Sequence, residues 1–88
     1  MKHFAVISRM LNIEINKQYR EEHLEYLKEL AAQGKVLAKG RFTDGTGGLV
    51  IYLGESLKEV TALVENDPFI AHGARSYEIH EWEMKMLR

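Results

Sequence analysis

The sequence contains no cysteine, a single proline and almost no net charge. Without cysteine there is no disulfide framework, no thiolate metal site and no cysteine nucleophile. Twelve Lys and Arg residues against thirteen Asp and Glu residues give a formal charge of -1, so no overall positive field exists to hold nucleic acid or an anionic membrane. The longest apolar run, Gly47 to Gly54, is far shorter than the roughly 20 residues of a membrane-spanning helix. These absences predict a soluble, cytoplasmic protein that has neither nucleic acid nor a membrane as a partner.

The length of 88 residues predicts a single domain over residues 1–88. A domain of this size buries only about 60 to 65% of the surface that its unfolded chain exposes. Because neither disulfides nor an evident metal site reinforce it, a core shared with a second subunit would stabilise it considerably.

Glycine, proline and apolar periodicity divide the chain into six elements. We expect a strand at 2–8 and an amphipathic helix at 16–33. Strands at 35–41 and 49–53 follow, joined by a hairpin at 44–45. A second helix begins at a Ser56-x-x-Glu59 capping box and ends near 66–68, and a last strand covers 75–84. The last strand changes its apolar face between Ile79 and Trp82, which predicts a bulge there or burial on both sides. The order β-α-β-β-α-β predicts an α+β protein, a ferredoxin-like sandwich with an antiparallel four-stranded sheet and two helices on one face.

The first three predicted strands do not alternate apolar with polar residues, which is typical of strands covered on both faces. Two helices cover only one face, and no other part of the chain is left to cover the second. We therefore predict a homodimer through the sheet face. The alternative is that short apolar strands simply tolerate exposed side chains.

His23 falls on the buried stripe of the first predicted helix, four residues after Tyr19. A buried imidazole needs a partner, because an unpaired one costs free energy. Asp67, at the end of the second helix, can reach it in this topology, and an Asp accepting from one ring nitrogen would leave the other as a proton acceptor. Alternatively, His23 is a hydrogen-bonded core residue and Asp67, with Pro68, initiates an ordinary turn.

Several short motifs together are similar to those of the YciI-like (YCII-related) family. They are His23-Leu24-Glu25-Tyr26-Leu27, Gly34 and Gly40, Asp44-Gly45 with Gly47-Gly48, Ser56-Leu57-Lys58-Glu59, Asp67-Pro68-Phe69 with Gly73, and Tyr77-Glu78-Ile79-His80-Glu81-Trp82. The resemblance covers nearly the full length and implies a ferredoxin-like subunit of the dimeric α+β barrel group. It also implies that His23 and Asp67 are the active-site pair of a pocket. Arg41 stands where proline is common in the family.

Four further residues are candidates for ligand binding. Arg9 and Arg41 lie just beyond apolar strand segments, where a guanidinium can fork onto a carboxylate or enolate oxygen; the alternative is a solvated charge at a strand end. Ser8 lies at the same end of its strand, and Tyr19 flanks His23, although aromatic residues at helical spacing usually belong to a core. No histidine and carboxylate spacing of a metal site is present, so we expect no metal and no cofactor.

The function that these residues favour is that of a cofactorless small-molecule enzyme of the lyase or isomerase kind. His23 would take a proton next to a carbonyl, Asp67 would hold His23 in place, and Arg41 would stabilise the developing oxyanion. The alternative is a non-catalytic dimeric ligand-binding or structural module in which the pair is a buried polar anchor. The sequence does not identify the small-molecule ligand.

Overall fold

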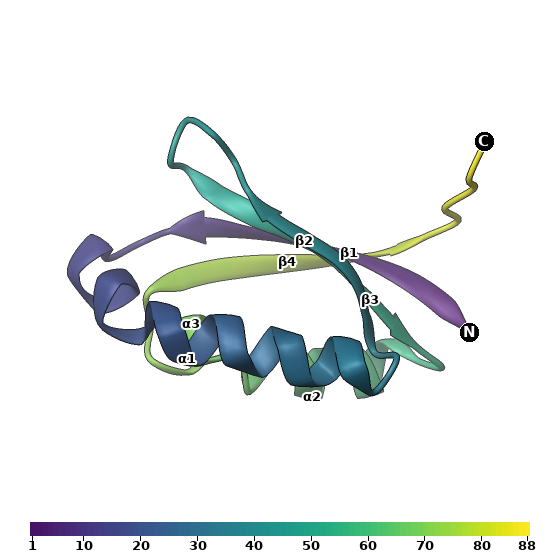
Figure 1. Ribbon diagram of the computed structural model, residues 1–88, viewed down its shortest axis with the longest axis horizontal. Coiled ribbons are helices and arrows are strands. Elements are labelled where there is room, and N and C mark those ends of the chain that lie inside the picture. Colours follow the sequence, from purple (N-terminus) through teal and green to yellow (C-terminus); the bar gives the residue numbers. More distant parts are fainter.

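The structure is a computed structural model that describes residues 1–88. Its elements in chain order are β1 (Lys2–Met10), α1 (Ile13–Ala32), β2 (Val36–Arg41), β3 (Gly47–Gly54), α2 (Leu57–Glu65), α3 (Pro68–Ala71) and β4 (Arg75–Trp82). The strands form one antiparallel sheet in the order β2-β3-β1-β4, and the helices lie on one face of it (Figure 1). This arrangement confirms the predicted ferredoxin-like α+β fold, the subunit fold of the dimeric α+β barrel group.

Side-chain caps begin the two longer helices. The Asn12 side chain accepts hydrogen bonds from the amides of Glu14 and Ile15, both at 3.0 Å, so α1 begins three residues earlier than the apolar pattern predicts. Ser56 accepts from the Glu59 amide at 3.1 Å and begins α2, as the capping box predicts. The Glu59 carboxylate accepts from the amide of Glu55, one residue before the cap. The predicted start of α2 is therefore confirmed.

A third helix, α3, was not expected from the sequence. Asp67 is its N-cap and accepts from the Phe69 amide at 2.9 Å, while Pro68 occupies the first helical position. Proline suits that position because its missing amide hydrogen would have no partner there and its φ is already helical. The pair Asp67-Pro68 therefore ends one helical region and begins the next, so α2 and α3 follow each other along the same face of the sheet.

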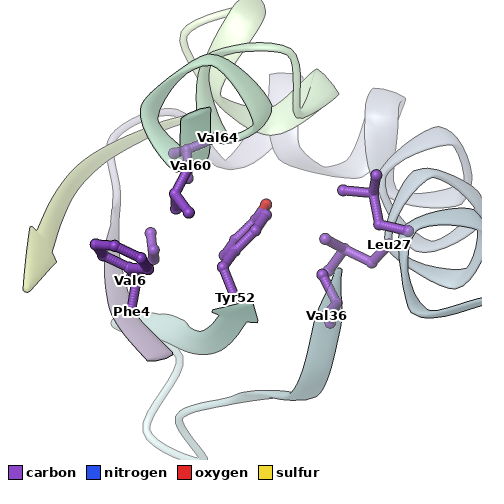
Figure 2. Packing of buried hydrophobic residues seen from close by; sticks show 8 residues of the cluster. Phe4, Val6, Leu27, Val36, Tyr52, Val60 and Val64 are labelled. Carbon is purple, nitrogen blue, oxygen red and sulfur yellow. The ribbon is translucent and has the colours of Figure 1, made fainter. Parts of the chain in front are cut away.

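The hydrophobic core lies between the sheet and the helices (Figure 2). Phe4 and Val6 of β1, Tyr52 of β3, and Val60 and Val64 of α2 are each at most 4% exposed. Figure 2 shows the Tyr52 ring at the centre of this cluster with its hydroxyl directed toward the helices. One face of the sheet is thereby covered within the single chain.

A bulge is present in the sheet, but not where the sequence indicated it. β1 and β4 pair in continuous register from His3 opposite Trp82 to Met10 opposite Arg75, so the prediction of a bulge near the end of β4 is wrong. Trp82 is instead 44% exposed, on the face of the sheet away from the helices. The bulge lies instead in β2, where the register shifts between Val36 and Ala38.

None of the helices is both long and apolar enough to cross a membrane.

Candidate active site

A cavity of about 340 Å³ lies between α1 and the helix-covered face of the sheet. Side chains of β1 and β3 that point toward the helices, among them Val6, Val50 and Tyr52, form its apolar wall. Residues of β2, the β2–β3 hairpin, α1, the α2–α3 region and β4 complete the lining. Small-molecule sites in proteins have volumes of roughly 300 to 1,000 Å³, so the space suits a small ligand.

His23 and Asp67 meet at this cavity. His23 Nδ1 lies 2.8 Å from Asp67 Oδ1, and the two side chains are 12% and 7% exposed. The same Asp67 oxygen accepts from the Phe69 amide at 2.9 Å, so the cap of α3 also holds the carboxylate in place. An ionised carboxylate only accepts, so His23 presents Nδ1–H to it, and in the neutral imidazole Nε2 is the nitrogen with a lone pair.

The Phe69 ring forms one side of the pair. It stacks on the His23 ring with centroids 3.9 Å apart and an interplanar angle of 13°. Phe69 is 3% exposed. Together the hydrogen bond and the stacking fix both the position and the plane of the imidazole.

Tyr52 belongs both to the core and to the cavity wall. Burial, with further contributions from the charge of Asp67 and from Tyr26, raises the pKa of Tyr52 far above its usual range. The phenol therefore stays protonated throughout the physiological range. It is a neutral hydroxyl, not a candidate base.

The bulge in β2 brings two cations to the cavity. Without it, Val36 would share a face with Ala38 and Gly40, because side chains alternate along a strand. With it, Val36 packs in the core and the later residues Lys39 and Arg41 lie opposite Val50 and Gly48, on the side of the helices. A bulge re-aims side chains in this way, and here it places Arg41 in the lining.

Ser8 lines the cavity as well, and its partner is a residue that the sequence analysis missed. Arg75 Nη1 donates to Ser8 Oγ at 3.1 Å, and Arg75 Nε donates to Asn16 Oδ1 at 2.9 Å. Arg75 precedes Tyr77 and Ile79 by two and four residues, and both of these pack against the core. This alternation could have placed Arg75 on the inner face of the sheet. Asn16, seven residues before His23, shares its face of α1 and could have been found by the same reasoning.

The structure does not bring Arg9 and Tyr19 to the cavity lining. Arg9 lies on the opposite face of β1, where its exposed guanidinium is 3.4 Å from the Glu78 carboxylate. Tyr19 stacks on His72 with centroids 3.8 Å apart. Of the six candidates from the sequence, the cavity thus gathers His23, Asp67, Arg41 and Ser8. No group of three or more His, Asp or Glu side chains is placed to hold a metal ion.

The fold and this site define a small ferredoxin-like α+β protein with a histidine–carboxylate pair at the wall of a cavity of about 340 Å³. The YCII-related domain model matches residues 1–83, and the chain belongs to that family. The resemblance seen in the sequence motifs is thereby confirmed. A relative, "Uncharacterized protein YjpA" of Bacillus subtilis (strain 168), is 32% identical over 72 residues, which cover 82% of this chain and 85% of that protein.

Among solved structures, the chain is similar to 5-chloro-2-hydroxyhydroquinone dehydrochlorinase (TftG) from Burkholderia phenoliruptrix AC1100, in its complex with 2,5-dihydroxybenzoquinone. The TM-score is 0.81 and the sequence identity 26%, over 94% of this chain and 95% of that one. The fold is therefore shared with an enzyme over nearly its whole length.

Proposed function

We propose that the protein is a cofactorless small-molecule enzyme of the lyase or isomerase kind, with His23 as general base and Asp67 as the residue that positions it. The observation that carries this proposal is the 2.8 Å contact between His23 Nδ1 and Asp67 Oδ1 at the wall of a cavity of about 340 Å³. With Nδ1–H held by the carboxylate, Nε2 is the atom that accepts a substrate proton.

The proposed step is the removal of a proton from a carbon next to a carbonyl group. The C–H bond breaks, the proton goes to His23 Nε2, and the electron pair moves onto the carbonyl oxygen to form an enolate. Arg41, which the β2 bulge turns into the cavity, stabilises that oxygen. The enolate then takes up a proton at another carbon, or it expels a leaving group such as chloride. The name of the dehydrochlorinase with the same fold supports the expulsion of a leaving group.

An exchange and elimination screen tests this proposal. Small carbonyl compounds and chlorinated hydroxyhydroquinones are incubated with the protein in deuterium oxide, while NMR follows deuterium incorporation and an electrode follows chloride release. We expect the wild type to turn over at least one compound and His23→Gln to slow it by on the order of 10²- to 10⁴-fold. Circular dichroism checks that the variant remains folded.

The matched control is His72→Gln. His72 is an exposed histidine that follows α3 and stacks on Tyr19 outside the cavity, and its replacement should leave the rate unchanged. A rate for His23→Gln equal to that of the wild type would contradict the catalytic role. The pair would then be the buried polar anchor of a non-catalytic ligand-binding module.

The open face of the sheet supports a homodimer as the form in which the protein acts. Phe4 and Val6 point into the core, so Ala5 and Ile7 point to the other face. Ile7 lies opposite Leu49 of β3 in the register, and both are partly buried within the single chain. A second copy packed face to face would cover this apolar strip and enlarge the core.

Light scattering tests the dimer. We expect the wild type to have a mass near twice the 10.2 kDa of one chain, and Ile7→Glu to have the mass of one chain, because a buried unpaired carboxylate opposes the contact. Leu57→Glu is the control, since Leu57 is 53% exposed at the start of α2, on the helix side. A wild-type protein with the mass of a single chain at high micromolar concentration would contradict the dimer.

A further inference from the structure

The charge of the cavity lining is opposite in sign to that of the whole chain. The formal charge of the chain is -1. The lining nevertheless holds four cationic side chains, Arg20, Lys39, Arg41 and Arg75, and a single carboxylate, Asp67. That carboxylate already accepts from His23 and from the Phe69 amide. The excess of positive charge is therefore concentrated around the space that a ligand would occupy.

We propose that this cavity binds a small organic anion, and that Arg75, Ser8 and Asn16 form the subsite for its negatively charged oxygens. This inference rests on the proposed function, because it names the substrate class of the same cavity. The subsite adds Arg75, Ser8 and Asn16, as donors to the ligand, to the pair of His23 and Asp67.

Arg75 is a partly buried cation without a carboxylate partner. Its Nε and Nη1 atoms donate to Asn16 and Ser8, which are both neutral, and it takes part in none of the ion pairs of the chain. A guanidinium has five N–H donors, so three remain after these two bonds. Burial lowers the pKa of Arg75, against a smaller opposing effect of Asp67, although an arginine stays charged at physiological pH. A bound anion would supply the missing countercharge.

The partners of Arg75 are also left with donors. A guanidinium only donates, so it fixes the Asn16 side chain with its oxygen toward Arg75 and leaves the Asn16 amide nitrogen as a donor. Ser8 Oγ likewise accepts from Arg75, which leaves the Ser8 hydroxyl hydrogen for another acceptor. The cluster thus offers donors from all three residues. Its natural ligand is a group that only accepts, namely a carboxylate, an enolate or a phenolate.

The surrounding structure places this cluster beside the base. Gly48 leaves room for the guanidinium, since a Cβ there would lie 3.2 Å from Arg75 Nη1. The guanidinium carbon also lies 4.5 Å from the centre of the Phe69 ring, the same ring on which His23 stacks. The base and the anion subsite therefore share Phe69 as a common neighbour. A substrate that carries an anionic oxygen a few bonds from its acidic C–H would reach both.

A matched pair of probes tests the subsite without any turnover. Nitrogen-15-labelled protein is titrated with sodium benzoate and with benzamide, which has the same shape but no charge, and the amide signals are followed by NMR. We expect saturable benzoate shifts at Ser8, Asn16 and Gly48, and benzamide binding weaker by about tenfold or more. Arg75→Met should weaken benzoate binding by about tenfold or more. Lys28→Met, which removes one charge from the exposed side of α1, should change it by less than about twofold.

The outcomes separate this inference from the proposed function. His23→Gln should keep its benzoate affinity, because the base is not needed for binding, even where it abolishes exchange. Benzamide binding as tight as benzoate, or Arg75→Met binding benzoate like the wild type, would overturn the anion subsite and leave the role of His23 to the exchange screen. Should Arg75→Met lose its dispersed NMR spectrum, Ser8→Ala replaces it. Ser8→Ala must then weaken benzoate binding by about threefold or more, and an unchanged affinity would overturn the subsite.

Discussion

Replacing Gly47 with alanine is expected to lower the free energy of unfolding by about 3 kcal/mol or more. Gly47 has a φ of +155°, which L residues rarely adopt, and an added Cβ would overlap the carbonyl oxygen of Ser8 and lie 2.7 Å from its carbonyl carbon. Both of these atoms belong to the backbone of β1, so no side chain can move aside. The strands β1 and β3 would have to separate at this end.

The effect is large for a chain of this size. At roughly 0.05 to 0.15 kcal/mol per residue, a domain of 88 residues has a total stability of about 4 to 13 kcal/mol. Urea denaturation measures the change, and Gly40→Ala is the control, because a Cβ at Gly40 of β2 meets no atom within 4 Å and its φ is ordinary. We expect Gly40→Ala to stay within about 0.5 kcal/mol of the wild type. If Gly47→Ala unfolded at the same urea concentration, the close approach of β1 and β3 at Ser8 would be contradicted.

Local patterns in the sequence are enough to predict the fold. Apolar runs, the Ser56 cap and the glycine-rich hairpin predicted every strand and both longer helices to within a few residues. The short helix α3 was not predicted, because the pair Asp67-Pro68 is typical of two different places in a helix. It is common where a helix ends, and it also provides the N-cap and the first residue of a new helix. Four residues contain too little periodicity to decide between them.

The candidate site could be predicted only in part, because its geometry depends on long-range register. His23 was placed inward by helical spacing alone, and the β-α-β-β-α-β order was enough to bring Asp67 near it. The inward direction of Arg41 depends instead on the register shift between Val36 and Ala38, which the residue types do not reveal. Strict alternation from the buried Val36 would have turned Arg41 to the open face. Arg75 was not predicted, because it is a charged residue on a strand face that apolar periodicity alone defines.

Replacing Asp67 with asparagine is expected to slow the proposed reaction by on the order of 10²- to 10⁴-fold while lowering stability by less than about 1 kcal/mol. Asparagine is as good an N-cap as aspartate, so the bond to the Phe69 amide is kept. The negative charge that stabilises a protonated His23 is lost. The Phe69 amide and His23 Nδ1 contact the same oxygen of Asp67, so the amide oxygen of asparagine can accept from both, and the expected loss of rate reflects the missing charge.

Asp67→Ala separates the structural role of the carboxylate from its proposed role in positioning the base. It removes the cap of α3 and leaves two buried donors, His23 Nδ1–H and the Phe69 amide, without their acceptor. We expect it to lower the free energy of unfolding by about 2 to 3 kcal/mol, which urea denaturation measures. Asp67→Asn should not show this loss of stability. A comparison of the two variants therefore separates the effect of Asp67 on the free energy of unfolding from its effect on the reaction rate.

The decisive comparison is the double variant. If His23 and Asp67 act as one unit, His23→Gln combined with Asp67→Asn should be no slower than His23→Gln alone, because the carboxylate has no base left to position. Initial rates of deuterium exchange in the four proteins measure this coupling. Rate losses that multiply would mean that Asp67 acts on the substrate by a route independent of His23. A wild-type rate for Asp67→Asn would contradict any part of Asp67 in the reaction, and the carboxylate would then serve α3 and the stability of the fold alone.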